Sequence, residues 1–226
     1  APFAKAGQTK RDTIFEVTVE QLPGGQDTLI ATDRIRSQEL AALPGSGEEA
    51  QRISEIWSGR CLLGVNASEA EFKKAAGNYR IIHLSTHGVV DSSSDYSFLA
   101  FAQDADQTEN EYLYIRELYN LLLNADLVVL SACKTALGRL QSGEGVISLA
   151  RGFAFAGAKS IVTTLWVAND DATKELMIDF HQQLKKKQPK DQALKVAKAN
   201  LQKHKSFAHP FFWASFIAVG DMSPLK

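Results

Sequence analysis

Short apolar runs alternate with segments of helical periodicity along most of this chain. The runs are mainly aliphatic or β-branched, which is typical of buried strands. The segments between them repeat their apolar positions with the spacing of one helix face. Strands are expected over 60–64, 79–85, 98–101, 127–131, 160–166 and 211–219, and helices over 48–57, 68–76, 145–157, 171–184 and 191–201, with a short strand and a helical turn within 112–120.

The alternation of strands and helices begins near residue 48. This order predicts an α/β fold, a three-layer sandwich whose mostly parallel sheet carries helices on both faces. The strands over 127–131 and 160–166 are separated by one helix, so they are expected to be neighbours. No repeat or long linker divides the chain, which indicates a single domain over residues 1–226.

The N-terminal part is less regular. The alternation over 13–19, the turn signal at 23–25 and the apolar run 28–31 predict a hairpin within residues 11–34. The glycine-rich stretch 43–47 predicts a loop. The chain begins with Ala1 rather than Met, so we expect a piece of a longer chain, truncated or processed at its N-terminus.

Two predicted strands end next to residues with catalytic chemistry. The run 79–85 is followed by Thr86-His87-Gly88, and the run 127–131 is followed by Ala132-Cys133. In open α/β sheets, ligands and reacting groups collect at the carboxyl ends of the strands. A cysteine is nucleophilic as its thiolate and needs a base or a cation nearby. The two strand ends therefore predict a thiol–imidazole pair.

The remaining four histidines are weaker candidates. His83 lies between apolar neighbours within a predicted strand and is expected to be a satisfied core residue. His181 and His204 lie in polar helical segments and are expected to be solvated. His209 precedes a proline and an aromatic run, which favours a structural role in a loop.

Composition narrows the class of function. Of the 226 residues, 45% are hydrophobic and 23% are charged, with a formal net charge of −1, so no general attraction to nucleic acid or to an anionic membrane is expected. The one basic run, 185–187, ends a predicted helix, where cations are favourable. No run reaches the length of a membrane span.

The number of cysteines indicates the redox compartment and argues against a zinc site. Two cysteines, Cys61 and Cys133, are too few for a disulfide framework or a zinc cluster, and they suit a reducing cytoplasm. Cys61 is expected to be a buried strand residue. We therefore predict a cytoplasmic protein without a metal or another cofactor.

The spacing of the pair is similar to that of a known peptidase class. Cys133 follows Ala132 and lies 46 residues after His87-Gly88, close to the spacing of about 50 residues in caspases. Further motifs resemble the CHAT family, the caspase-like peptidase module that is often attached to tetratricopeptide repeats in bacteria. They are His83-Leu84-Ser85-Thr86-His87-Gly88, Leu130-Ser131-Ala132-Cys133-Lys134-Thr135, Gly143-Glu144-Gly145, Ala150-Arg151-Gly152-Phe153, Gly157-Ala158-Lys159-Ser160-Ile161-Val162, Leu165-Trp166, Asp170-Asp171-Ala172-Thr173, His209-Pro210 and Trp213-Ala214-Ser215-Phe216.

The resemblance implies a cysteine endopeptidase with a caspase-like fold and a Cys–His dyad. Cys133 would attack the scissile carbonyl to form a thioester acyl-enzyme, and His87 would handle the protons. The backbone N–H groups of Gly88 and Cys133 would hold the oxyanion. The substrate would be a protein, and attached domains of the tetratricopeptide type, or other partners, would regulate the module.

Two alternatives to the peptidase remain open. Cys133 and Arg139 have the C-x5-R spacing of the phosphate loop in cysteine phosphatases, although Leu140 stands where that class has Ser or Thr. A catalytically silent interaction module is the other alternative.

Specificity is predicted from the end of the strand 160–166. Trp166 is expected to lie beside the substrate cleft, and Asp170, four residues later, could select a basic P1 side chain. Residues 169–171 also suit the start of the following helix, so a capping role competes with the pocket role. Ser131 adds no charge to the pocket, which leaves an apolar P1 residue as the alternative.

Overall fold

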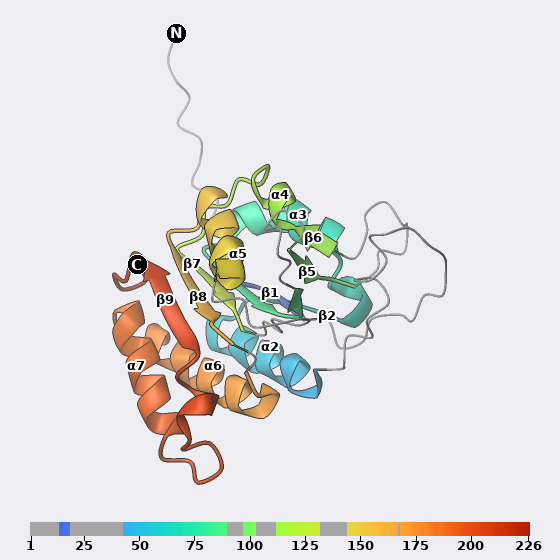
Figure 1. Cartoon of the computed structure of the whole chain (residues 1–226). Helices are drawn as coiled ribbons and strands as arrows, with labels where there is room; N and C mark the ends of the chain where they lie inside the picture. Colours follow the sequence, from blue (N-terminus) through green and yellow to red (C-terminus); the bar gives the residue numbers. More distant parts are fainter. Residues whose placement is uncertain (1–13, 19–42, 90–96, 103–111, 132–143, 167) are drawn as a thin grey trace.

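The structure, a computed structural model, describes residues 14–18, 43–89, 97–102, 112–131, 144–166 and 168–226 (Figure 1). Its centre is a six-stranded sheet in the order β2-β1-β3-β7-β8-β9. The strands are β1 (Ile14–Thr18), β2 (Arg60–Leu63), β3 (Ile81–Ser85), β7 (Leu127–Leu130), β8 (Ser160–Thr164) and β9 (Phe216–Gly220). The first five run parallel and β9 is antiparallel to β8. The mostly parallel sheet and the expected pairing of β7 with β8 are confirmed.

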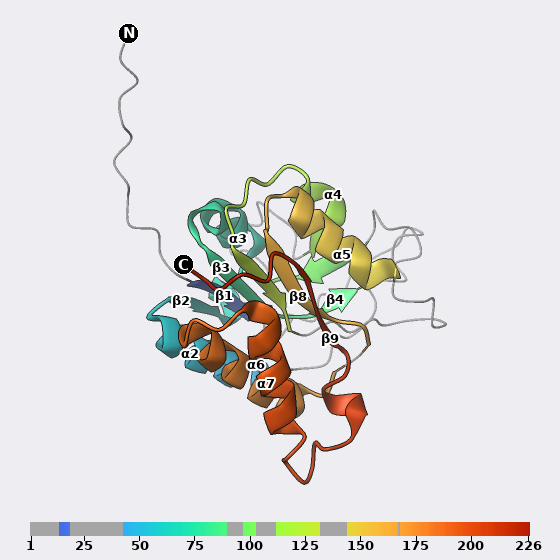
Figure 2. The same cartoon turned by 90° about the vertical axis from the view of Figure 1, so that its left-hand side faces the viewer.

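Helices cover both faces of this sheet, as Figures 1 and 2 show. One face carries α3 (Glu69–Ala75), α4 (Ile115–Leu118) and α5 (Glu144–Phe155), and the other carries α2 (Pro44–Trp57), α6 (Asp170–Lys185) and α7 (Lys190–Leu201). Alternate residues of the strands point to opposite layers because side chains alternate along a strand. Ile82, Leu84 and Val128 join the α3–α5 core, whereas Ile81 and Val129 join the α2–α6–α7 core.

A second, antiparallel sheet branches from the end of β3. It consists of β4 (Gly88–Val89), β5 (Phe98–Ala100) and β6 (Tyr112–Tyr114), in that order. The aromatic rings of Phe98, Tyr112 and Tyr114 pack together on it. The chain therefore leaves the main sheet at Ser85 and joins the small sheet at Gly88, with Thr86 and His87 between the two.

Two helices begin with a side-chain cap. The Ser68 hydroxyl accepts a hydrogen bond from the Glu71 N–H at 3.3 Å, and the Asn169 side chain accepts one from the Ala172 N–H at 3.0 Å. These bonds satisfy amide donors that have no partner within the first turn of a helix. Local sequence thus determines where α3 and α6 begin.

Three expectations about the backbone are wrong. β1 is no arm of a hairpin, because β2 and β3 occupy both of its edges, and residues 28–31 lie outside the described part of the chain. The stretch 43–47 is not a loop, since α2 begins at Pro44, and proline is well suited to the first turn of a helix. The last strand begins at Phe216 rather than at residue 211, because Pro210–Phe212 form a 3₁₀ turn.

Candidate functional site

His87 lies at the corner between the two sheets and is 2% exposed. Two hydrogen bonds to Ala100 of β5 fix the backbone here. The Ala100 N–H donates to the His87 carbonyl at 2.8 Å, and the Thr86 hydroxyl donates to the Ala100 carbonyl at 2.5 Å. Gly88 starts β4 directly after it and is buried. The small sheet thus holds His87 at the carboxyl end of β3.

The carboxyl ends of β3 and β7 are joined next to this corner. The Ser131 N–H donates to the Leu84 carbonyl at 3.1 Å, and the Ser131 hydroxyl donates to the Ser85 hydroxyl at 3.1 Å. Both serines are buried. In the sequence, each stands two residues before a member of the predicted dyad, Ser85 before His87 and Ser131 before Cys133. Cys133 and Arg139 lie outside the described residues.

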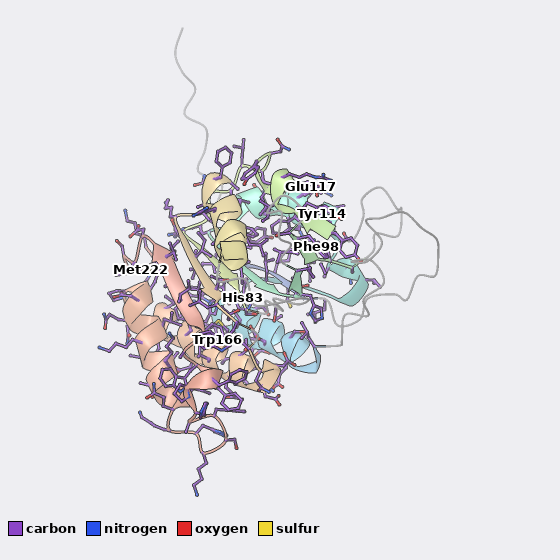
Figure 3. All side chains as sticks on the ribbon, in the orientation of Figure 1. His83, Phe98, Tyr114, Glu117, Trp166 and Met222 are labelled. Atoms are coloured by element: carbon purple, nitrogen blue, oxygen red, sulfur yellow. The ribbon has the colours of Figure 1, made fainter. Side chains whose placement is uncertain are left out.

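A chain of buried polar side chains lies between β3 and the helices α2 and α6. His83 Nε2 lies 2.7 Å from Glu49 Oε1, and His83 Nδ1 lies 3.1 Å from His181 Nε2. Trp57 Nε1 donates to His181 Nδ1 at 3.0 Å. Glu49, His83 and His181 are each at most 1% exposed. His83, labelled in Figure 3, is the central member and lies in the interior of the molecule.

The donor and acceptor of every hydrogen bond in this row of side chains follow from Trp57 at one end. An indole N–H can only donate, so His181 Nδ1 carries no proton. Neutral His181 then carries its proton on Nε2 and donates to His83 Nδ1. His83 is therefore also neutral, with its proton on Nε2, and donates to the Glu49 carboxylate. Adding a proton to His83 would leave His181 without one on either nitrogen, so the chain holds two neutral imidazoles and one carboxylate.

The burial of His181 predicts sensitivity to acid. Burial, followed by the neighbouring His83, lowers the pKa of His181 well below 6.5. The unfolded chain binds this proton at about the ordinary value, so stability is lost as the pH falls below 6.5. We expect a loss of about 1.4 kcal/mol per pH unit from this residue, measured by urea unfolding. An equal slope in the His181→Gln protein would contradict this origin.

Asp170 connects the first turns of α6 and α2. Its Oδ2 accepts the Gly45 N–H at 2.6 Å, and a Cβ at position 45 would lie only 2.8 Å from that oxygen, so a larger residue there would displace the Asp170 carboxylate. Burial raises the pKa of Asp170, as do the nearby carboxylates Glu49 and Asp171, while the Gly45 N–H acts in the opposite direction. The helix-start role of residues 169–171 is confirmed, with Asn169 as the cap, and the pocket role of Asp170 stays a prediction.

Trp166 follows β8 at the same edge of the sheet. Its indole N–H donates to the Phe211 carbonyl at 3.1 Å, and Figure 3 shows it at the end of the sheet near the loop that follows α7. Asp170 lies at the start of α6, which leaves this same edge. The fold therefore gathers His87, Ser131, Trp166 and Asp170 at one edge, as expected for residues that follow the ends of parallel strands.

The predicted environments of the other histidines and of Cys61 can be compared with the structure. The buried, satisfied state of His83 is confirmed, whereas the solvated state of His181 is wrong, because its helix face packs under the sheet. His204 is exposed as expected, and His209 has its structural role, accepting the Phe211 N–H at 3.2 Å. Cys61 is half-buried in β2 rather than buried.

Two features of the site were not predicted from the sequence, the role of Glu49 and the contact of Asp170 with Gly45. Glu49 stands four residues before Ile53 and eight before Trp57, on the apolar face of the predicted helix, and that position was the available signal.

Within the described ranges, no cluster of three or more His, Cys, Asp or Glu side chains could hold a metal ion. In the same ranges, no helix has the length and apolar character needed to cross a membrane.

The fold is similar to that of a known cysteine proteinase. The structure matches gingipain R (RGPB), described as an Arg-specific cysteine proteinase, with a TM-score of 0.55 and 9% sequence identity over 95% of this chain and 47% of the other. The architecture is thus that of the caspase-like α/β proteins. The CHAT domain matches residues 4–221, and the chain belongs to the CHAT family.

Curated relatives place this domain in long proteins. Tetratricopeptide repeat protein 28 of Mus musculus is 25% identical over 214 residues, and that of Homo sapiens is 24% identical over the same length. The matches cover 79% of this chain but only 9% and 8% of the two relatives. The chain therefore spans less than a tenth of the proteins that it matches.

Proposed function

We propose that this chain is a cysteine endopeptidase in which His87 and Cys133 form the dyad. The observation that carries the proposal is the hydrogen bond between Ser85 and Ser131, which ties two neighbouring parallel strands at the points where each leads into a dyad residue. The caspase-like fold and the CHAT membership support the same reaction class. The tetratricopeptide context of the relatives supports regulation by such a region.

The proposed reaction has two stages. The Cys133 thiolate attacks the scissile carbonyl carbon, and the N–H groups of Gly88 and Cys133 stabilise the negative oxygen of the tetrahedral intermediate. His87, as the imidazolium, gives its proton to the leaving amine, and a thioester remains. Neutral His87 then takes a proton from water, whose oxygen attacks the thioester and releases the acid and the thiolate.

Peptide profiling tests both the reaction and its specificity. A peptide library varied at P1 is expected to be cleaved by the wild-type protein and left intact by Cys133→Ala. We expect a preference for basic P1 residues, because a carboxylate at the site edge attracts Arg and Lys. The Arg specificity named for gingipain R supports this expectation.

Asp170→Asn isolates the charge of Asp170 from its structural contact, since an amide oxygen can still accept the Gly45 N–H. This variant is expected to lose the basic preference by about 10–100-fold with an unchanged melting temperature. If the protein prefers Leu or Met at P1 and Asp170→Asn does not change this preference, Asp170 has only its structural role at the start of α6.

A further inference from the structure

A long C-terminal stretch of the chain contains basic residues and no acidic ones. From Gln192 to Gly220 the sequence contains four lysines and no Asp or Glu. Among the described residues, none of these lysines forms an ion pair with a carboxylate, whereas Lys73, Lys159 and Lys174 elsewhere in the fold each do. The four lysines are Lys195, Lys198, Lys203 and Lys205.

Two of these lysines, Lys203 and Lys205, lie in a loop with packed aromatic rings, residues 202–215, which we call the aromatic loop. His204 stacks on Phe207 with centroids 4.8 Å apart, and Phe207 contacts Phe212 at 5.4 Å. The Trp213 indole N–H donates to the Ala208 carbonyl at 3.1 Å. These contacts hold the loop in one shape in the absence of a partner, which lowers the entropic cost of binding.

Part of this aromatic surface faces solvent. Phe211 is 48% exposed, and Lys203 and Lys205, eight and six residues before it in the same loop, are also exposed. Lys203 donates to the Asn200 side chain at 2.9 Å, and Asn200 in turn donates to Asp179, so Lys203 has no direct ion pair with a carboxylate among the described residues. Aromatic groups surrounded by polar residues are the usual anchors of protein interfaces.

The topology places the aromatic loop at the edge that carries His87. α7 ends at Leu201, and β9, antiparallel to β8, begins at Phe216 opposite Thr164, the last residue of β8. The loop between them therefore lies at the carboxyl end of β8. The hydrogen bond from Trp166 to the Phe211 carbonyl joins it to that edge.

We infer that the aromatic loop is a docking surface for an acidic polypeptide segment with an apolar anchor residue. Phe211 would contact the anchor, while Lys203 and Lys205 would pair with Asp or Glu on either side of it. The identity of this segment as part of a protein substrate rests on the proposed peptidase function. Its docking would bring the scissile bond to the neighbouring edge of the sheet.

The chemistry of the loop favours a polypeptide over other polyanions. The chain contains no arginine after Arg151. Arginine provides the bidentate fork that suits phosphate groups and guanine edges, whereas lysine acts as a point charge that pairs well with single carboxylates. The rigid ring cluster and one exposed Phe also suit a single side-chain anchor.

Binding can be measured without turnover in the Cys133→Ala protein. The probe is a short fluorescein-labelled peptide rich in Glu with a central Phe, followed by fluorescence anisotropy. We expect salt-dependent binding that Lys203→Glu/Lys205→Glu weakens about tenfold or more, and that Phe211→Ala also weakens. The matched control is Lys185→Glu/Lys186→Glu, which makes the same change of charge at the C-terminal end of α6. This control should leave binding unchanged.

Several results would overturn the inference. Equal binding of a peptide with Lys in place of Glu would show that ion pairing does not drive binding. An unchanged affinity in Lys203→Glu/Lys205→Glu would show the same. Tighter binding to phosphatidylserine vesicles or to a single-stranded oligonucleotide would assign the loop to a membrane or to nucleic acid. An inactive wild-type protein that still binds the acidic peptide would contradict only the peptidase proposal.

Discussion

His87→Ala and Cys133→Ala are each expected to reduce the hydrolysis of a fluorogenic peptide by at least about a thousandfold. The thiol is a poor nucleophile without a base or a cation beside it, and the leaving amine departs slowly without a proton from the imidazole. Cys61→Ala is the matched control. Cys61 is half-buried in β2, away from the strand ends that carry the site, so this variant should retain most of the activity. Full activity in Cys133→Ala would exclude the dyad.

Covalent labelling separates the peptidase from its alternatives. A thiol-directed peptidyl electrophile should modify Cys133 in the wild-type protein and not in His87→Ala. In a phosphatase, Arg139→Ala would abolish turnover of an aryl phosphate, and labelling would not depend on His87. A silent interaction module would show neither turnover nor His87-dependent labelling.

His83→Ala is expected to lower the free energy of unfolding by about 3–5 kcal/mol, because it leaves the buried Glu49 carboxylate and the His181 Nε2–H without their partner. Urea unfolding measures this loss. His204→Ala removes an exposed imidazole that stacks on Phe207 and should lower stability by no more than about 1 kcal/mol. Glu49→Gln keeps an acceptor for His83 and should be far milder than His83→Ala.

The same variants test the choice of histidine. If His83→Ala folds normally, with wild-type stability, but loses peptide turnover, then His83 rather than His87 is the catalytic base. If His83→Ala is unstable while Glu49→Gln is stable and active, the buried chain is a structural support of β3, and His87 retains its role.

Local patterns were sufficient for most of the elements and for the position of His87 after β3. Apolar runs located β3, β7 and β8, and a single intervening helix was enough to place β8 beside β7. Ser68 and Asn169 determine helix starts by hydrogen bonds within their own first turns. Because parallel strands end at one edge of a sheet, the order of the strands alone assigns His87 and the residues after β8 to that edge.

Long-range packing decided what the patterns left ambiguous. His181 has the polar neighbours Gln182 and Gln183, yet it also lies on the helix face of Met177 and Leu184, and contact with the sheet buries that face. Likewise, β1 alternates as a hairpin strand would, but it pairs between β2 and β3.

The sequence by itself determined the fold class, the family and the edge that carries His87, because these depend on periodicity and on short motifs. Only the tertiary structure decided that Glu49, His83, His181 and Trp57 form one oriented chain, and that Asp170 holds Gly45. Those contacts join residues 34 to 125 positions apart in the sequence, and no local pattern encodes which distant side chains share a buried layer.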